Sequence, residues 1–286
     1  MPSLIDIRRR IRSVKNTEQI TKAMKMVSAA KLRRAQDRVI ASRPYGALLR
    51  RVLSDVAMAA GTNESAAVDP LLARRPEQRI LLVLITSDKG LAGAFNSNLI
   101  KGAERFIAEH ANAAVRMELI GRKGRDFFRK RGAVISGEHV GLAAKVSYAD
   151  SAAIARKAMD LYRAGEIDAV YLIYNEFKSV ISQKLTLDPV LPVEMPAAAA
   201  PVDYIYEQPP VELLESLLPR YVEMEFYRAL LESTAAEHAA RMTAMEAATS
   251  NAGEMIDKLT LYMNRVRQAS ITKEIIEVVS GAAAAE

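Results

Sequence analysis

The fold follows from residues 242–270, which read MTAMEAATSNAGEMIDKLTLYMNRVRQAS. Apolar or small residues recur along this stretch in strict steps of three and four. Four heptads in register are typical of a coiled-coil seam, along which one helix packs against another. The seam consists of Met242, Met245, Thr249, Ala252, Ile256, Leu259, Met263, Val266 and Ser270. We therefore predict a long helix from about residue 211 to the end, with Pro219 kinking it or marking its true start.

A second helical pattern lies at the other end of the chain. Its apolar face is formed by Ile7, Ile11, Val14, Ile20, Ala23 or Met24, Val27 and Ala30. The steps slip in phase near Asn16, and no proline interrupts them before Pro44. This pattern predicts a helix of about 40 residues or more.

The charges are divided unevenly between the ends and the middle. Residues 1–51 hold 14 Lys and Arg against three acidic residues, whereas residues 211–286 hold seven basic and 12 acidic residues. Residues 52–210 hold 19 charges of each sign, so the net charge of +6 comes from the two ends. A basic helix and an acidic helix attract each other, although exposed ion pairs contribute little and the apolar seam dominates.

The middle of the chain has a different pattern. The run ILLVLI at residues 80–85 is typical of a strand buried on both faces. Further strands are predicted at residues 117–120, 133–136, 169–174 and 184–190. Helices are predicted at residues 96–111, 122–130 and 149–164. Alternating strands and helices indicate an α/β domain with a mainly parallel, Rossmann-like sheet.

These patterns predict a long antiparallel coiled coil of the two terminal helices with an inserted α/β domain. The predicted divisions are residues 1–59 for the first helix, 76–192 for the α/β domain and 209–286 for the second helix. The flanking residues 60–78 and 189–210 are rich in Ala, Pro and polar residues and are interpreted as linkers. The second helix is longer, so its last turns should project beyond Met1. Since residues 278–285 carry no charge, we expect another molecule to surround this tip.

The sequence offers no catalytic, cofactor or metal site. With no cysteine, disulfides, thiolate metal sites and Cys nucleophiles are excluded. The turn SDKGLAG gives GxxG at Gly90 and Gly93 and lacks the phosphate-binding glycine patterns. Histidines 110, 139 and 238 show no ligand spacing and are interpreted as surface or cap residues. The acid pairs Glu223/Glu225 and Glu274/Glu277 are interpreted as parts of solvated helix faces.

Two other classes of protein remain as alternatives. A Rossmann-like enzyme with helical appendages would bind a nucleotide saturably. A nucleic-acid-binding coiled coil would bind DNA or RNA with a steep salt dependence. The missing glycine pattern argues against the first, and the lack of aromatic residues among the N-terminal charges argues against the second. No stretch reaches the length of a membrane-spanning helix, so membrane association would run through partners or surface charge.

Three segments resemble the gamma subunits of bacterial ATP synthases. They are IRRRIRSVKNTEQITKAMKMVSAAKLRRAQ near the start, TSDKGLAGAFN in the middle and NRVRQASITKEIIEVVSGAAAA at the end. The resemblance spans the whole chain in the right order and is more specific at the ends than in the middle. It implies a rotor shaft that has no catalytic activity of its own, couples rotation of the c-ring to conformational cycling of the catalytic beta subunits, and sits at the cytoplasmic face of the bacterial inner membrane.

The resemblance also implies partners. Three alpha and three beta subunits would surround the coiled coil, and the epsilon subunit and c-ring would bind the foot. It allows for an inhibitory subunit and implies no cofactor, no nucleic acid and contact with the membrane only through partners. In this family an acidic loop on each beta subunit presses on the shaft, which suits a basic helix.

Several residues match positions at which gamma subunits contact the alpha–beta ring. Met24 with Lys22 and Lys25 would face the beta loops, and Lys89 would face the same acidic loop. The remaining matched residues are Arg267 and Gln268, which would grip a beta loop, and the coupling residues Thr272 and Arg241. Lys89 stands where relatives often have Arg, which implies loss of the bidentate fork. Ala92 stands where many relatives have Cys, and the dithiol insert of chloroplast relatives is absent.

Overall fold

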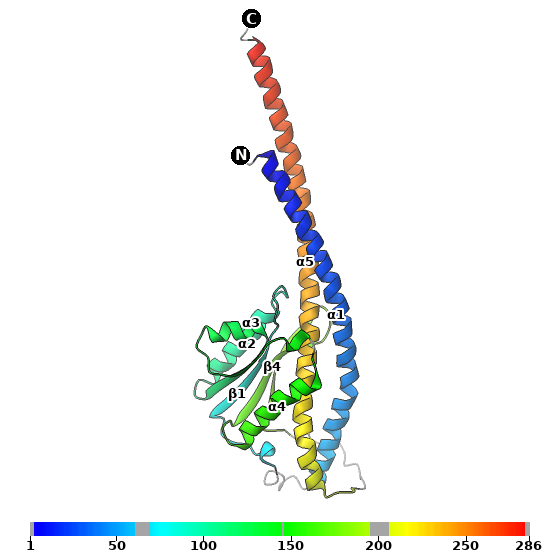
Figure 1. The fold of residues 1–286 in the computed structure, drawn as a ribbon, viewed down its shortest axis with the longest axis vertical. Coiled ribbons are helices and arrows are strands. Elements are labelled where there is room, and N and C mark those ends of the chain that lie inside the picture. Colours follow the sequence, from blue (N-terminus) through cyan, green and yellow to red (C-terminus); the bar gives the residue numbers. More distant parts are fainter. Residues whose placement is uncertain (1–2, 61–68, 145, 195–205, 284–286) are drawn as a thin grey trace. The chain divides into compact units, whose positions relative to one another are not determined.

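The computed structural model describes residues 3–60, 69–144, 146–194 and 206–283. The chain falls into two compact units, one formed by residues 29–241 and the other by residues 1–28 together with 242–286. Helices α1 (Leu4–Ala59) and α5 (Pro210–Ala283) each contribute to both units (Figure 1). Parts of both predicted linkers, residues 61–68 and 195–205, lie outside the described residues.

A five-stranded sheet forms the centre of the unit of residues 29–241. Its strands are β1 (Arg79–Ile85), β2 (Ala114–Ile120), β3 (Ile135–His139), β4 (Ala169–Phe177) and β5 (Gln183–Leu191). They lie in the order β3-β2-β1-β4-β5, and only the β4–β5 pair is antiparallel. The predicted mainly parallel, Rossmann-like sheet is confirmed. The structure starts β2 three residues earlier than predicted and places β3 two residues later.

Helices cover both faces of this sheet (Figure 1). Strand β1 is buried along six of its seven residues, because α2 (Phe95–Glu109) and α3 (Arg122–Arg129) lie on one side and α4 (Tyr148–Arg163) on the other. The α4 side also receives α1 and α5, whose Leu53, Leu218 and Phe226 belong to the main hydrophobic core. The helices from the two ends of the chain are therefore part of the core of the α/β unit.

One predicted linker contains ordered structure. The 3₁₀ helix η2 (Pro70–Leu72) begins at Asp69, whose carboxylate accepts a hydrogen bond from the Leu71 amide at 2.9 Å. The Leu71 side chain is fully buried in the main core. A second short 3₁₀ helix, η3 (Leu142–Ala144), precedes α4. Residues 60–78 were thus wrongly interpreted as linker throughout, because a capped apolar turn can anchor a loop to a core.

Two ion pairs show the direction in which α1 and α5 pack in the unit of residues 29–241. Arg43 contacts Glu232 at 3.3 Å, and Arg50 contacts Glu225 at 2.9 Å. The residue numbers of both pairs add up to 275, and a constant sum means that the helices run antiparallel. Pro219 lies inside α5 rather than at its start, because the buried Leu214 and Leu218 hold the preceding turns on the core.

The second unit shows the same antiparallel packing. Thr249 donates a hydrogen bond to Thr21 across the helix pair at 2.8 Å, and Lys25 pairs with Glu246 at 2.6 Å. These pair sums are 270 and 271. Every residue of the seam predicted within 242–270 is buried or half-buried. The antiparallel coiled coil is confirmed.

The seam on α1 differs from the prediction. The buried and half-buried positions continue in steps of three and four from Ile7 without a phase slip. The predicted seam residues Ile20 and Val27 are 59% and 56% exposed, whereas the small polar Thr21 and Ser28 are 8% and 3% exposed. The prediction was right for Ile7, Ile11, Val14 and Met24, and it was wrong for Ile20, Val27 and Ala30 because it followed apolarity. Small hydroxyl side chains fit a close helix contact, and their hydroxyls can bond across the seam or to the backbone.

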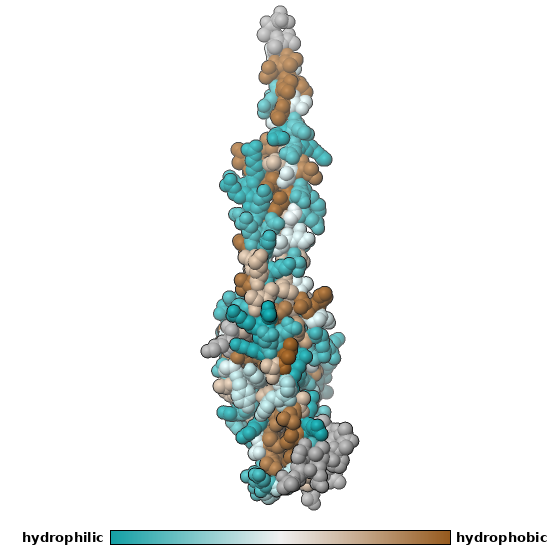
Figure 2. Space-filling view, turned by 90° about the vertical axis from the view of Figure 1, so that its right-hand side faces the viewer, coloured by the Kyte–Doolittle hydropathy of each residue, from teal (hydrophilic) through white to brown (hydrophobic). Residues whose placement is uncertain are grey.

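The end of α5 is apolar and uncovered within its unit. Because the pair sums are about 271, Leu4 lies opposite residue 267, and later residues have no counterpart on α1. Ile275, Ile276 and Val278 are 58%, 58% and 72% exposed. Figure 2 shows hydrophobic surface along these last described turns. Residues 278–281 of the predicted apolar tip are thus exposed, and residues 284 and 285 of it lie outside the described residues.

A buried charge cluster joins strands β2 and β3 to helix α4. The Glu118 side chain is 1% exposed and accepts hydrogen bonds from His139 at 2.7 Å and Lys157 at 2.9 Å. Gly137 leaves the room for this carboxylate, since a Cβ there would lie 2.7 Å from Lys157 Nζ and against the Glu118 oxygen. His139 is therefore a partner of a buried carboxylate rather than the surface or cap residue predicted.

This cluster predicts a pH dependence of stability. Burial raises the pKa of Glu118, but the hydrogen bonds from His139 and Lys157 and their charges outweigh it, so the net pKa is lowered. A carboxyl with a lowered folded-state pKa stabilises the fold above its unfolded pKa and loses this contribution as pH falls through the folded value. We expect the free energy of unfolding, measured by urea titration, to fall below about pH 4.5.

The substitution Glu118→Gln should lower the free energy of unfolding by about 2 kcal/mol at pH 7, because it leaves Lys157 without its charged partner. It should also reduce the loss of stability between pH 5 and 3. Glu138→Gln is the matched control, since Glu138 lies on the neighbouring strand with a more exposed side chain, paired to Arg129. Identical pH profiles for the wild type and Glu118→Gln would contradict this account.

Candidate functional site

The turn after strand β1 is held from several directions. The Asp88 carboxylate accepts hydrogen bonds from the backbone amides of Arg122 and Gly141, both at 3.0 Å. The Ser87 hydroxyl donates to the Lys89 carbonyl at 2.6 Å. These hydrogen bonds connect the turn to the segments that follow β2 and β3. The Lys89 side chain is exposed.

Helix α5 supplies a further contact to the same turn. The Arg241 guanidinium donates to the carbonyls of Lys89 at 3.3 Å and Gly90 at 3.2 Å, and it pairs with Glu237 at 2.7 Å. Both charged side chains are nearly buried, at 10% and 8% exposure. Burial raises the pKa of the Glu237 carboxyl above its usual value, an effect that Arg241 opposes. Arg241 thus faces its own chain rather than the surface.

A groove beside this turn is rich in positive charge. It encloses about 250 Å³ between α1, α5 and the turn. Its charged lining residues are Lys31, Arg34, Arg38, Asp88, Lys89, Glu237 and Arg241. Asp88 and Glu237 are already bonded within the chain. The groove therefore presents an excess of cations along one face of α1.

His238 lies in the wall of this groove without a charge. Burial, followed by the nearby charges of Arg241 and Lys31, lowers its pKa to about 4. Among the described residues it is the one whose buried side-chain nitrogen, Nδ1, has no hydrogen-bond partner. The prediction of a surface or cap role was wrong for this histidine, which is an uncharged wall of the groove at neutral pH.

Helix α5 also covers the carboxyl edge of the parallel strands. Glu232 accepts a hydrogen bond from the Phe177 amide at the end of β4, at 3.1 Å. Ser233 lies 3.5 Å from the Ile85 carbonyl at the end of β1. In open α/β sheets ligands bind outside the carboxyl ends of the strands where the strand order reverses, here between β1 and β4. In this chain the helix occupies that position.

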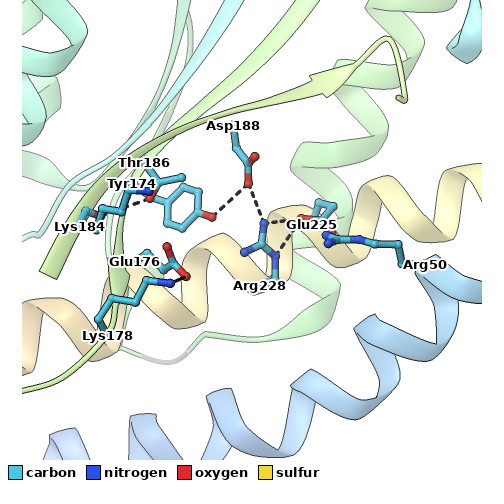
Figure 3. A network of polar contacts seen from close by, with 9 residues as sticks. All are labelled: Arg50, Tyr174, Glu176, Lys178, Lys184, Thr186, Asp188, Glu225 and Arg228. Carbon is cyan, nitrogen blue, oxygen red and sulfur yellow. Dashed lines mark hydrogen bonds and ion pairs between the residues drawn. The ribbon is translucent and has the colours of Figure 1, made fainter. Parts of the chain in front are cut away.

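A polar network joins the two helices to the sheet edge (Figure 3). Arg228 on α5 donates to Asp188 of β5 at 2.7 Å and to Glu225 at 2.6 Å. Tyr174 of β4 donates to the same Asp188 at 3.1 Å, and Arg50 of α1 bonds to Glu225 at 2.9 Å. The network therefore links α1, α5, β4 and β5 through Arg228.

The network corrects the prediction for the first acid pair. Glu223 and Glu225 are 6% and 8% exposed and do not lie on a solvated face. Glu223 accepts hydrogen bonds from Arg156 and Tyr148, both at 2.6 Å. Burial, then the hydrogen bond to Glu223, raises the pKa of Tyr148 to about 12. These acids are buried because α5 is enclosed on several sides here, and arginines pair with them.

The first group of predicted contact residues lies on α1 in the coiled-coil unit. Lys22 is exposed, whereas Met24 and Lys25 are half-buried toward α5. The Lys25 ammonium is paired with Glu246 at 2.6 Å. Lys22 is thus available to a partner protein. Lys25 can bind a partner only if it releases Glu246 or shares its ammonium group between Glu246 and the partner.

The second group lies near the end of α5. Three exposed residues form it: Arg267 and Gln268 are adjacent, and Thr272 lies one turn later. The Thr272 hydroxyl donates to the Gln268 carbonyl at 2.9 Å, so this side chain is bonded to its own helix. Since Met24 lies opposite residue 247, these residues are 20 to 25 positions, or about 30–38 Å, further along the unit.

The predicted residues therefore fall into three places. Lys89 and Arg241 come together at the turn, and the other two groups lie at separate levels of the coiled coil. Sequence reasoning missed the groove cations Lys31, Arg34 and Arg38. Their spacing along one helix face was the signal that could have found them.

Comparisons with known proteins agree along the whole chain. The ATP synthase family model matches residues 3–285. The ATP synthase gamma chain of Solibacter usitatus (strain Ellin6076) is 77% identical over 286 residues, and the alignment covers all of both chains. The ATP synthase gamma chain of Anaeromyxobacter sp. (strain Fw109-5) is 54% identical over 289 aligned positions, which cover 99% of each chain.

Solved structures show the same fold. A chain from the Tetrahymena thermophila mitochondrial ATP synthase central stalk and c-ring matches with a TM-score of 0.60 and 28% identity, over 80% of this chain and 99% of that one. A chain of the Euglena gracilis mitochondrial ATP synthase matches with a TM-score of 0.68 and 19% identity, over 98% of this chain and 94% of that one. The terminal helices, the inserted sheet and these full-length similarities establish that the chain belongs to the ATP synthase gamma-chain family.

Proposed function

We propose that this chain is the central-stalk rotor of a proton-translocating ATP synthase. In this role its coiled coil turns inside a ring of three alpha and three beta subunits, and its foot binds epsilon and the c-ring. Rotation of the c-ring turns the shaft, which changes the conformations of the catalytic beta subunits. The observation that carries the proposal is the antiparallel helix pair ending in an exposed apolar tip, in a chain that matches gamma chains over its full length.

The surface of the coiled coil supports contacts with a surrounding ring. Ile20, Met26 and Val27 of α1 are exposed, although the opposite side of the helix is packed against α5. Exposed apolar residues between lysines suit a surface that touches partners and releases them. The uncharged end of α5 suits an apolar collar, since an uncovered apolar tip tends to aggregate in water.

The charge of the helices supports an acidic partner. Residues 1–51 carry a net charge of +11, and the groove cations Lys31, Arg34 and Arg38 lie on this helix. Interactions between exposed charges are screened over about 8–10 Å at physiological salt, so such contacts form and break locally. We propose Met24, Lys22, Lys25, Lys89, Arg267, Gln268 and Thr272 as contacts with the ring, and Arg241 as a residue of the same site.

The proposal assigns no catalytic role to the chain itself. Its support is the position of α5, which lies over the carboxyl edge where α/β enzymes bind their ligands. The chemistry would take place on the beta subunits. The Arg228 network supports a mechanical role, because it ties both helices to the sheet that forms the body of that unit.

The proposal also assigns a place in the cell. Within the described residues, no helix is both long and apolar enough to span a bilayer. We propose that the chain is held peripherally at the cytoplasmic face of the bacterial inner membrane by epsilon and the c-ring. The segments of residues 1–59 and 209–286 would form the shaft, and residues 76–192 the body.

Reconstitution tests the proposed function. The full chain is combined with alpha, beta and epsilon subunits and the membrane sector of its own organism, and ATP hydrolysis and proton pumping are measured. We expect coupled pumping only when the chain is present. Equal hydrolysis and equal pumping without the chain would contradict the proposal.

A further inference from the structure

The seam of α1 becomes narrow within the unit of residues 29–241. Steps of three and four place Val39, Ser42, Gly46, Leu49 and Leu53 on the inward side of α1, and all five are buried or half-buried. Ser42 and Gly46 are the two small members of this run. A Cβ at Gly46 would meet nothing within 4 Å, so the space that a larger seam residue would fill is open.

This space belongs to a cavity of about 420 Å³ between α1, α5 and the end of β4. Its buried apolar lining includes Leu49, Phe177 and Met224, which are 7%, 5% and 9% exposed. A cavity beside buried apolar side chains is unfavourable, because these side chains lose the contacts that close packing provides. The volume lies within the range of about 300–1,000 Å³ that is typical of small-molecule sites.

The sequence of α1 is also unfavourable for a helix beside this cavity. Pro44 lies inside α1 and has no N–H with which to donate the helical hydrogen bond. Gly46, two residues later, disfavours the helix further through its conformational freedom. A leucine at position 46 would improve the helix and fill the space. Folding alone therefore does not explain the glycine, whereas a site that takes a ligand does.

Three cations surround the mouth of the cavity. The side chains of Arg43, Arg50 and Lys178 are 56%, 50% and 54% exposed, whereas their glutamate partners are only 5%, 11% and 23% exposed. Figure 3 shows Arg50 and Lys178 on opposite sides of Arg228. The carboxylates are thus covered and already bonded within the chain. Each arginine bonds its glutamate through Nη2, and a guanidinium has five N–H donors, so donors remain for an incoming anion.

We propose that this cavity binds a small amphipathic anion, a molecule with an apolar body and a carboxylate head. The body lies in the space that Gly46 leaves, against the buried apolar lining, and the head binds Arg43, Arg50 and Lys178. The bound molecule completes the seam between α1 and α5 and thereby stabilises the folded chain. This inference is independent of the proposed function, because no other subunit takes part in the binding.

The probe is 2-naphthoate, which joins a flat apolar body to one carboxylate. Its binding to the free full chain is measured by isothermal titration calorimetry, and 2-naphthamide is the uncharged comparison of the same shape. We expect one saturable site per chain for naphthoate and about tenfold weaker binding of the amide, as follows from losing a charge-assisted contact. Naphthoate should also raise the melting temperature of the chain. Absence of saturable naphthoate binding would overturn the inference.

The substitution Gly46→Leu fills the cavity from within α1. Its Cβ has room and leucine is the better helix former, so the melting temperature of the free chain should equal or exceed that of the wild type. We expect the affinity for naphthoate to fall about tenfold or more. Ala41→Leu is the matched control, since Ala41 is exposed on the same helix and does not line the cavity. Unchanged affinity of Gly46→Leu would mean that the probe binds elsewhere, which overturns the inference.

The substitution Arg43→Gln tests the charged mouth and decides the matter even where Gly46→Leu fails to fold. It should weaken naphthoate binding about three- to tenfold and leave the affinity for naphthamide unchanged. Lys101→Gln is the control, because Lys101 is an exposed cation of α2 outside the cavity lining, and it should change neither affinity. An equal loss for both probes, or no loss for either, would show that Arg43 binds no anionic head and would overturn the inference.

Discussion

Replacement of Gly121 by alanine is expected to lower the free energy of unfolding by about 3–5 kcal/mol. Gly121 has φ +93° directly after β2. A Cβ there would lie 2.8 Å from the Thr86 hydroxyl and against the Thr86 carbonyl oxygen. The obstacle is backbone, which cannot rotate away. Denaturant unfolding of the free chain measures the effect.

Gly132→Ala is the matched control for this prediction. Gly132 also has a left-handed φ, +69°, but a Cβ there would meet nothing within 4 Å. This substitution should lower the free energy of unfolding by only about 1–2 kcal/mol, which is the backbone strain alone. Equal losses for the two variants would mean that the close approach to Thr86 contributes nothing.

The double substitution of Arg267 and Gln268 by alanine should act on function instead of stability. Both residues are exposed where the pairing of α5 with α1 ends, so the free energy of unfolding should change by less than about 0.5 kcal/mol. In the reconstituted complex we expect ATP hydrolysis to fall about tenfold or assembly to fail, as for the loss of an interface anchor. The nucleotide affinity of the isolated beta subunit should not change.

Lys258→Ala is the control on the same helix. Lys258 is also exposed, and it pairs with Glu254 at 3.8 Å within α5. This variant should hydrolyse ATP as the wild type does. Full activity of the Arg267/Gln268 double variant would remove both residues from the proposed contacts with the ring.

The regular parts of the fold could be predicted because one physical effect dominates each of them. The apolar run of β1 predicts a strand covered on both faces, and six of its residues are buried. The heptad repeat of residues 242–270 predicts a helix seam, and the same positions are buried or half-buried. In both cases the pattern of apolar residues determines which side chains leave water.

The seam on α1 could not be predicted in the same way. Thr21 and Ser28 occupy buried positions, while the more apolar Ile20 and Val27 face outward. Hydrophobicity alone misassigns such a helix when the outward face also binds a partner. The prediction of a solvated face for Glu223 and Glu225 failed for a related reason. Their position between apolar residues in the run VEMEF was a signal that this part of the helix is buried on all sides.

The candidate site was predicted as a set of residues but not as an arrangement. The resemblance identified Lys89 and Arg241 without showing that the second holds the first. The positive φ of Leu91, +63°, could not be predicted from the sequence pattern, because the backbone dihedrals of a turn depend on contacts with elements distant in sequence. Long-range contacts of this kind appear only with the coordinates.

The central claim is that the two ends of the chain form one rigid axle. Thr21 and Thr249 contact each other at 2.8 Å across the helices, and the chain has no cysteine. Replacing both by cysteine allows a single disulfide between the helices. The measurement is the ATP-driven rotation of a probe attached to this variant in an immobilised alpha–beta ring, before and after oxidation. We predict the same rotation rate in both states, whereas rotation that stops on oxidation and returns on reduction would show that the helices move against each other.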